Sequence, residues 1–370
     1  MTAMSEPTAD EWAAEVANRQ QAQRWFETSN PATYVGARHH TVPAFILRRF
    51  AEERERLQVW RRSTEEIKPG SVGNLAIRDF YTTLNTDGQF DGRMEEQLGS
   101  VETAAKPVID WLLSPFRGRQ LSKQQQVALC ALVAFQMVRG PRRRKEVELL
   151  AEYGVKLLND GSLSDTDLRD TIIVPHPNEH IRLMGPTSEA IFLSILRRPA
   201  QVIRLDAPLL VVCDEPVLVD VEDHERHLPE CSLSEAELRR RQREQAGYDG
   251  TFSQPVHIWT TRPAGVDNAD AIAMPVAPDA LIVLGPMGQA VQPVLTYKGD
   301  EARALAGEVN AALVKQAYEW VAANPGHPTF ASWTFPPLGP LIRACDGGSV
   351  MSEQLQAAPV LRWQRIRKDW

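Results

Sequence analysis

Six polar side chains fall within stretches of this 370-residue sequence that are otherwise apolar, and their types suit acid–base chemistry on an anionic ligand. Burying such groups without partners costs on the order of 2 to 7 kcal/mol, so we expect them to meet one another or a ligand. A histidine beside a carboxylate can transfer protons, and an arginine can hold a phosphate or a carboxylate through paired hydrogen bonds. The six residues are His40, Glu102, Gln136, Arg139, His180 and Asp214.

We predict that these side chains converge in one pocket for a phosphate or carboxylate ligand. The catalytic candidates are His40, Glu102, His180 and Asp214, and the ligand-binding candidates are Gln136, Arg139, Arg142 and Asn74. The alternative is a buried polar network that pins the helices together, because structural networks also bury charged groups. The sequence leaves both interpretations open.

Two adjacent histidines, His39 and His40, precede an apolar helix that we expect to begin at Thr41, with Pro43 in its first turn. Neighbouring residues of a strand or loop point to opposite sides, so both rings are not expected to serve one site. The simplest interpretation is that one ring faces solvent and the other caps or packs against the helix. We expect such a role for His39 and keep His40 as the site candidate.

A charged segment at residues 220–250 contains three side chains with the spacing of metal ligands, His224, His227 and Cys231. Asp223 lies beside them. Only three good ligands occur there, and no second pair follows at the spacing of a zinc finger. We therefore assign no residue to a metal.

The arginine-rich run RGPRRRK at residues 139–145 is the best candidate for a contact with nucleic acid. The acidic residues Glu146 and Glu148 follow it, and no aromatic residues are interleaved to stack on bases. These observations favour a solvated helix start, and nucleic acid is the less favoured partner.

The composition constrains the setting in which the protein works. The chain carries 41 Lys and Arg against 48 Asp and Glu, a net charge of −7, which repels nucleic acid and anionic lipid unless basic residues gather on one face. No apolar run reaches the roughly 18 residues needed to cross a bilayer, and the amino terminus lacks the pattern of a signal peptide. The four cysteines are scattered. We predict a soluble cytoplasmic protein without a membrane partner.

No motif identifies a reaction or a cofactor. The sequence has no phosphate-binding G-x-x-x-x-G-K-[ST] loop, no dinucleotide-binding G-x-G-x-x-G after a strand and no G-x-S-x-G turn. ATPase, dehydrogenase and α/β-hydrolase interpretations therefore lose their usual support, and the cofactor stays unassigned.

The hydrophobic pattern predicts an α+β fold with a helical body to about residue 198. The clearest helix spans residues 93–113, and a capping box of Ser122 and Gln125 opens an apolar helix that ends at Gly140 and Pro141. Strands are expected in LQVWRR and LAIRDFYTTL, and residues 199–298 are rich in short β-branched runs. We expect a helical arm at residues 1–36, one domain at 37–323 closed by a helix at 300–323, and an irregular tail at 324–370.

The order of several short motifs resembles the DUF4238 family of bacterial and fungal proteins. The matching pieces run from HHTVPAFILRRFA through VWRR, NLAIRDFYT and the Glu95-x-x-Leu98-x-x-x-Glu102 helix to FQMVRGPRRR, NEHIRLM, CDEPV and AMPVAPDALIVL, and end at Asn310. The resemblance implies a bacterial, intracellular, mostly helical protein with a smaller β portion. It carries no assigned activity.

Two functions follow from these observations. The leading hypothesis is a protein with a pocket for an anionic ligand or nucleotide, which as an enzyme would be a hydrolase acting on a phosphodiester or a nucleotide. The alternative is a non-catalytic interaction or regulatory protein whose polar residues are structural.

Overall fold

The computed structural model has a mixed α+β fold, as the sequence predicts. Three of the segments discussed above lie outside the described residues. They are the expected arm at residues 1–36, the side chains with metal-ligand spacing at 223–231 and nearly all of the charged insertion at 220–250. The structure describes residues 38–78, 80–84, 90–91, 93–114, 121–157, 177–220, 257–260 and 266–345.

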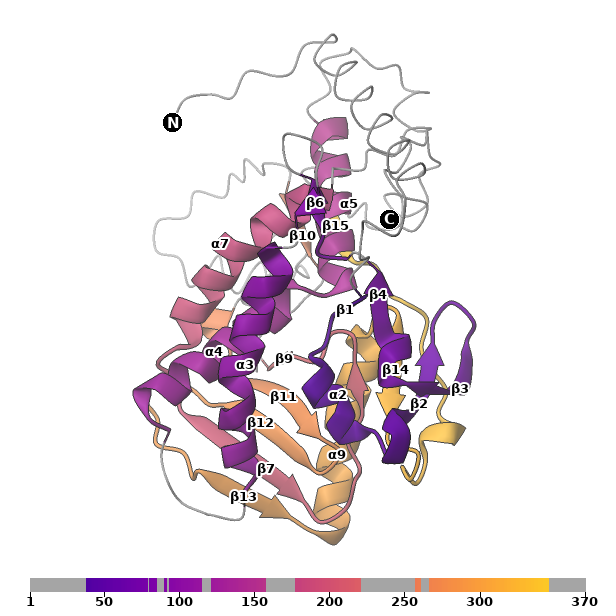
Figure 1. The fold of residues 1–370 in the computed structure, drawn as a ribbon, viewed down its shortest axis with the longest axis vertical. Helices are drawn as coiled ribbons and strands as arrows, with labels where there is room; N and C mark the ends of the chain where they lie inside the picture. Colours follow the sequence, from indigo (N-terminus) through magenta and orange to yellow (C-terminus); the bar gives the residue numbers. More distant parts are fainter. Residues whose placement is uncertain are drawn as a thin grey trace, which may run out of the picture.

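Three long helices pack side by side on one part of the molecule: α4 contacts both α3 and α7 (Figure 1). None of the helices in the described ranges is long and apolar enough to span a membrane. The α-helices are α2 (Ala44–Phe50), α3 (Arg93–Leu113), α4 (Lys123–Val138), α5 (Pro141–Leu157), α7 (Pro177–Ile195) and α9 (Gly299–Gln316). Short 3₁₀ turns are η1 (Glu53–Glu55), η2 (Val72–Leu75), η5 (Val266–Asn268) and η6 (Phe330–Ser332).

Two larger sheets carry most of the strands. The five-stranded sheet has the order β13-β7-β12-β11-β9, formed by β13 (Val294–Tyr297), β7 (Ala200–Leu205), β12 (Ala280–Leu284), β11 (Ala271–Ala277) and β9 (Leu218–Asp220). The four-stranded sheet has the order β3-β2-β14-β8, formed by β3 (Glu66–Ser71), β2 (Arg56–Arg61), β14 (Trp320–Ala323) and β8 (Val212–Cys213). Three two-stranded pairs complete the described strands: β1 (Arg38–His40) with β4 (Ala76–Arg78), β5 (Thr83–Leu84) with β6 (Phe90–Asp91), and β10 (His257–Thr260) with β15 (Ile342–Cys345).

The helix expected over residues 300–323 is shorter than its sequence suggests. It ends at Gln316, and Ala317 takes a non-helical backbone conformation. Residues Trp320–Ala323 form β14 instead, which pairs antiparallel with β2 from the start of the chain. All four residues of β14 are buried, so pairing and burial at the centre of a sheet override their helix propensity.

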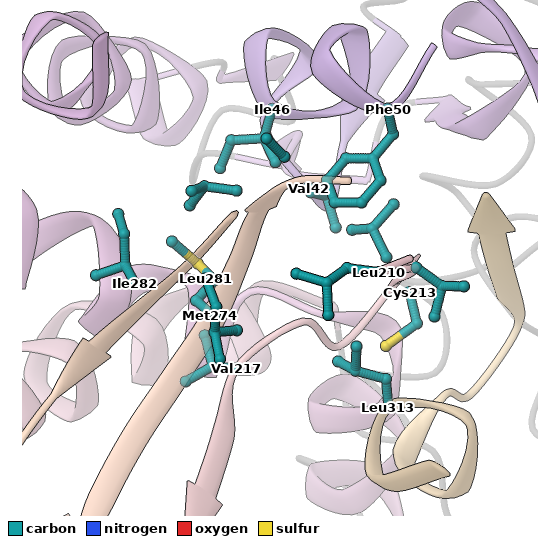
Figure 2. Packing of buried hydrophobic residues seen from close by; sticks show 14 of the residues in the cluster. Val42, Ile46, Phe50, Leu210, Cys213, Val217, Met274, Leu281, Ile282 and Leu313 are labelled. Carbon is teal, nitrogen blue, oxygen red and sulfur yellow. The ribbon is translucent and has the colours of Figure 1, made fainter. Parts of the chain in front are cut away.

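The apolar core joins the two sheets to the helices around them. Ile46 and Phe50 of α2 face the same interior as Met274 of β11, with Leu313 of α9 at its far end (Figure 2). Residues beyond 323 also enter this core, since Phe330 belongs to it and has no exposed surface. The part expected to be an irregular tail therefore contributes packing as far as the structure describes it.

The α3, α4 and α5 helices position four of the polar candidates, which are Glu102, Gln136, Arg139 and Arg142. Ser122 caps α4 as expected, through reciprocal hydrogen bonds with Gln125. Helix α4 ends at Val138, Arg139 is its C-cap residue, and α5 begins at Pro141. The glycine–proline break thus separates the two helices within the arginine-rich run at residues 139–145.

Candidate functional site

The backbone oxygen of Thr41, directly after β1, organises the first group of polar side chains. Gln136 Nε2 and Arg139 Nε both donate hydrogen bonds to it, each at 2.8 Å. Both side chains come from the carboxyl end of α4. None of the three residues is more than 1% exposed, so this arrangement is fully buried.

Arg139 also forms an ion pair with Glu102 of α3. Its Nη1 donates to Glu102 Oε1 at 2.8 Å, and the Glu102 side chain remains 26% exposed. The Tyr81 hydroxyl donates to the Arg139 backbone oxygen at 3.0 Å. The guanidinium is therefore held through Nε and Nη1, the Arg139 backbone is held by Tyr81, and the carboxylate partner Glu102 is partly exposed to solvent.

The two adjacent histidines point to opposite sides of β1, but the buried one is His39. It is 1% exposed, its Nδ1 accepts the Tyr81 backbone N–H at 2.7 Å, and its ring stacks on the Tyr81 ring. The expectation that His39 faces solvent is wrong, because the 80–81 segment covers it. Helix α2 itself begins only at Ala44, so Thr41 precedes it.

His40 is half-buried and lies close to the charges of Glu102 and Arg139. Its Nε2 is 3.1 Å from the Val72 backbone oxygen, which can only accept, so Nε2 carries the proton and Nδ1 is free to accept in the neutral ring. Burial lowers the pKa of His40, and the Arg139 charge acts in the same direction, whereas the Val72 hydrogen bond and the Glu102 charge oppose it.

Glu95 of α3 belongs with these residues, although it was not among the sequence candidates. Burial raises the pKa of its carboxyl; Arg139 opposes this shift and Glu102 adds to it. The signal was present, because Glu95 and Glu102 lie seven residues apart on one helix face. No sequence pattern indicated Thr41 as a site residue, since threonine is common just before a helix. We call His40, Thr41, Glu95, Glu102, Gln136 and Arg139 the Arg139 cluster.

Arg142 lies outside the Arg139 cluster, in an ionic network at the start of α5. Its Nε pairs with Glu146 Oε1 at 3.0 Å, its Nη1 donates to the Gln316 backbone oxygen at 3.2 Å, and its backbone N–H donates to Glu215 Oε1 at 3.0 Å. This network joins α5 to α9 and to the chain after β8. The structure therefore gives Arg142 protein partners in place of a position in the predicted ligand site.

His180 of α7 is also held apart from His40. Its Nε2 lies 3.1 Å from the Val138 backbone oxygen, and Arg144 Nε donates to its Nδ1 at 3.4 Å. Arg144 in turn lies over the Phe80 ring and donates to the Phe80 backbone oxygen. Burial, with the nearby Arg144 charge, lowers the pKa of His180 to about 3. The ring is a neutral, buried link between helices.

Asp214 follows β8 and is fully buried. Its carboxylate accepts the backbone N–H groups of Tyr318 and Glu319, directly before β14. Burial raises the pKa of Asp214, and the charges of Glu215 and Glu319 add to the shift. Asp214 thus orders the turn from α9 into β14.

Asn74 is exposed, and its side chain closes a capping box with Ser71 at η2. Its Oδ1 accepts the Ser71 backbone N–H at 3.0 Å and the Ser71 hydroxyl at 2.7 Å. This local role accounts for the asparagine.

The arginine run at residues 139–145 is not an exposed basic surface. Arg139, Arg142 and Arg144 are all buried, and each is bonded to groups of the protein. The expected solvated helix start is therefore wrong for these three arginines, because carboxylates, carbonyl oxygens and an aromatic ring surround them.

The structure brings His40, Glu102, Gln136 and Arg139 together and places His180, Asp214, Arg142 and Asn74 in separate surroundings. Among the described side chains, no group of three His, Cys, Asp or Glu residues is arranged to hold a metal ion. The Arg139 cluster thus combines a fixed cation, carboxyl groups and an imidazole.

Comparison with known proteins identifies one family. No curated protein and no solved structure matches the chain. A family model described as a protein of unknown function, DUF4238, matches residues 38–327, which include the whole Arg139 cluster. Because this match covers well over half of the chain, the protein belongs to the DUF4238 family.

Proposed function

We propose that the Arg139 cluster binds a small anionic ligand, with a phosphate group as the chemistry that fits best. The observation that carries this proposal is the buried guanidinium of Arg139. Its Nε and Nη1 are engaged by Thr41 and Glu102, whereas its buried Nη2 has no hydrogen-bond partner among the described residues. A guanidinium nitrogen held in position in this way is a preorganised donor for a ligand oxygen.

The enzymatic form of the proposal is a hydrolase acting on a phosphodiester or a nucleotide. His40 Nδ1 takes a proton from water, the water oxygen attacks phosphorus, the P–O ester bond breaks, and protonated Glu95 gives its proton to the leaving oxygen. The lowered pKa of His40 and the raised pKa of Glu95 support these roles, because a base must be unprotonated and an acid protonated at the working pH. Glu102 orients Arg139.

Ligand binding is tested by the phosphate-induced rise in melting temperature. We expect sodium phosphate to stabilise the wild-type protein and Arg139→Lys to lose most of that effect, since a lysine keeps the charge but not the fixed fork of donors. Arg303→Lys is the matched control, because Arg303 is exposed on α9 and pairs only with Asp300 among the described residues. A wild-type protein that phosphate does not stabilise would refute the proposal.

Hydrolysis is tested separately on a chromogenic phosphodiester and a nucleotide panel. Glu95→Gln should abolish turnover but keep the phosphate-induced stabilisation, because the amide retains the shape of the acid but does not donate an acidic proton. If the wild-type protein binds phosphate and hydrolyses none of these compounds, the enzymatic form is wrong and the binding function remains.

A specific observation favours the second candidate function, a non-catalytic interaction or regulatory protein with a structural polar network. Arg142, Arg144, His180 and Asp214 all bond to the backbone or to side chains of other elements and join α5, α7, α9 and β8. Under this alternative, Arg139 would be one more such link. Loss of folding in Arg139→Lys, with no effect of phosphate on the wild-type protein, would support it.

We also propose a cytoplasmic location in a bacterial cell. Cys130 and Cys213 are free and buried, which suits a reducing compartment. The bacterial source is proposed from the resemblance to a family with bacterial and fungal members. Fractionation of cells producing the full chain tests the location, and recovery in the periplasm or the membrane would contradict it.

A further inference from the structure

Three buried polar atoms without partners gather in the Arg139 cluster. They are Thr41 Oγ1, Gln136 Oε1 and Arg139 Nη2, and none has a hydrogen-bond partner within the described ranges. Gln136 Nε2 and Arg139 Nε both bond to the Thr41 oxygen. The free amide oxygen and the free guanidinium nitrogen are each attached to the same carbon as one of these donors, so all three unpartnered atoms lie around one carbonyl.

The chemistry of the three atoms is mixed. Arg139 Nη2 can only donate, Gln136 Oε1 can only accept, and the Thr41 hydroxyl can do either. A ligand that offers only acceptor oxygens would satisfy Arg139 but leave Gln136 Oε1 buried and unpaired, which weakens its binding. A ligand that presents a hydroxyl next to an acceptor oxygen satisfies both.

The charges around the cluster also favour a ligand that keeps a proton. Glu102 pairs with Arg139, and Glu95 lies close enough to both for their charges to shift its pKa. The Glu102 carboxylate beside the guanidinium disfavours a fully deprotonated dianion and accepts a hydrogen bond from a protonated one, and Glu95 adds to this effect when it is ionised. Charge and hydrogen bonding thus select the same kind of ligand.

We propose that the Arg139 cluster recognises a phosphoryl group that keeps a P–OH hydroxyl, as hydrogen phosphate does, and rejects sulfate. This inference rests on the proposed anion-binding function and adds its specificity. Of the two substrate classes in the enzymatic form, it favours a nucleotide with a terminal phosphate, because a phosphodiester has no P–OH to donate. Arg139 Nη2 donates to one phosphoryl oxygen, and the P–OH donates to Gln136 Oε1 or to Thr41 Oγ1. Sulfate has the same tetrahedral shape but no proton to donate at neutral pH.

The test compares the affinities of sodium phosphate and sodium sulfate for the full chain at matched ionic strength, by calorimetry and by melting temperature. We expect phosphate to bind at least about tenfold more tightly, since about 1.4 kcal/mol corresponds to a factor of ten and one unpaired buried acceptor costs that much. Thr41→Val should reduce this ratio at least about threefold, whereas Thr41→Ser, which keeps the hydroxyl, should retain it. Thr41→Val is expected to fold, because Oγ1 makes no hydrogen bond to any described residue.

The outcomes separate the two proposals. Binding of phosphate but not sulfate, weakened in Thr41→Val, supports both. Equal binding of the two anions overturns the inferred specificity and leaves the anion site standing. Binding of neither overturns the proposed function together with the inference. Selectivity that is unchanged in Thr41→Val overturns the assignment to the hydroxyl of that residue.

Discussion

Gly140, which links α4 to α5, is a position where one added methyl group should destabilise the packing between these helices and Glu215. A Cβ built there would overlap the carboxylate of Glu215 and would lie only 2.8 Å from even its more distant oxygen, Oε2. The Glu215 carboxylate is not free to swing away at no cost, because it is 3% exposed and accepts the Arg142 backbone N–H at 3.0 Å. Gly140→Ala must therefore either break this bond or tolerate the overlap.

The expected loss of stability follows from these two routes. Breaking a hydrogen bond to a buried charged group costs about 1.5 to 3 kcal/mol, and overpacking costs about 1 to 3 kcal/mol, so the protein takes the cheaper route. The φ of Gly140 is not positive, and the loss of glycine's freedom in the unfolded chain offsets about 0.4 to 1 kcal/mol. We expect Gly140→Ala to lower the free energy of unfolding by about 1 to 2 kcal/mol.

Urea unfolding followed by tryptophan fluorescence measures this change, with Gly307→Ala as the matched control. Gly307 is exposed in the middle of α9 and a Cβ there contacts nothing within 4 Å, so that substitution should stabilise the protein by about 0.5 to 1 kcal/mol. Glu215→Asp should lower the free energy of unfolding less in the Gly140→Ala protein than in the wild-type protein, because the shorter side chain relieves the overlap with the added methyl group. If Gly140→Ala were as stable as Gly307→Ala, the Glu215 carboxylate would not be fixed against this corner.

Two further substitutions test the network around the arginines. Tyr81→Phe removes the hydroxyl that donates to the Arg139 backbone oxygen and should lower the free energy of unfolding by about 0.5 to 1.5 kcal/mol; a urea midpoint equal to wild type would show that this bond is not stabilising. His180 has a folded pKa of about 3 against about 6.5 when unfolded, so its contribution is complete above pH 6.5 and is lost as the pH falls toward 3. Between pH 7 and pH 5 the wild-type protein should lose about 2 kcal/mol more than His180→Gln does, and parallel pH profiles of the two proteins would contradict the buried neutral ring.

Local features determined the helices that carry the candidates. The periodic apolar residues of 93–113 predicted α3 with the bounds that the structure has, and Ser122 with Gln125 predicted the start of α4. Gly140 and Pro141 predicted the break that makes Arg139 a C-cap residue. These signals succeed because hydrogen bonds within a helix, its caps and its apolar stripe all depend on residues a few positions apart.

Tertiary contacts decided which candidates share a site. Residues 40, 102, 136 and 139 meet only because the carbonyl of Thr41 and the carboxylate of Glu102 approach the end of α4 from distant parts of the chain. His39 is buried and His40 is half-exposed because residues 80–81 cover one side of β1, and no local pattern reveals such a cover.

The sequence by itself determined the family, the α+β class and the polar residues from which any site must be built. Only the tertiary structure decided that Arg142, His180 and Asp214 bind other elements, that residues 320–323 form a strand beside β2, and that Thr41 belongs to the Arg139 cluster. The physical reason is that burial turns a polar side chain toward whatever partner the packed chain provides. That partner lies far away in the sequence, whereas propensity and periodicity register only near neighbours.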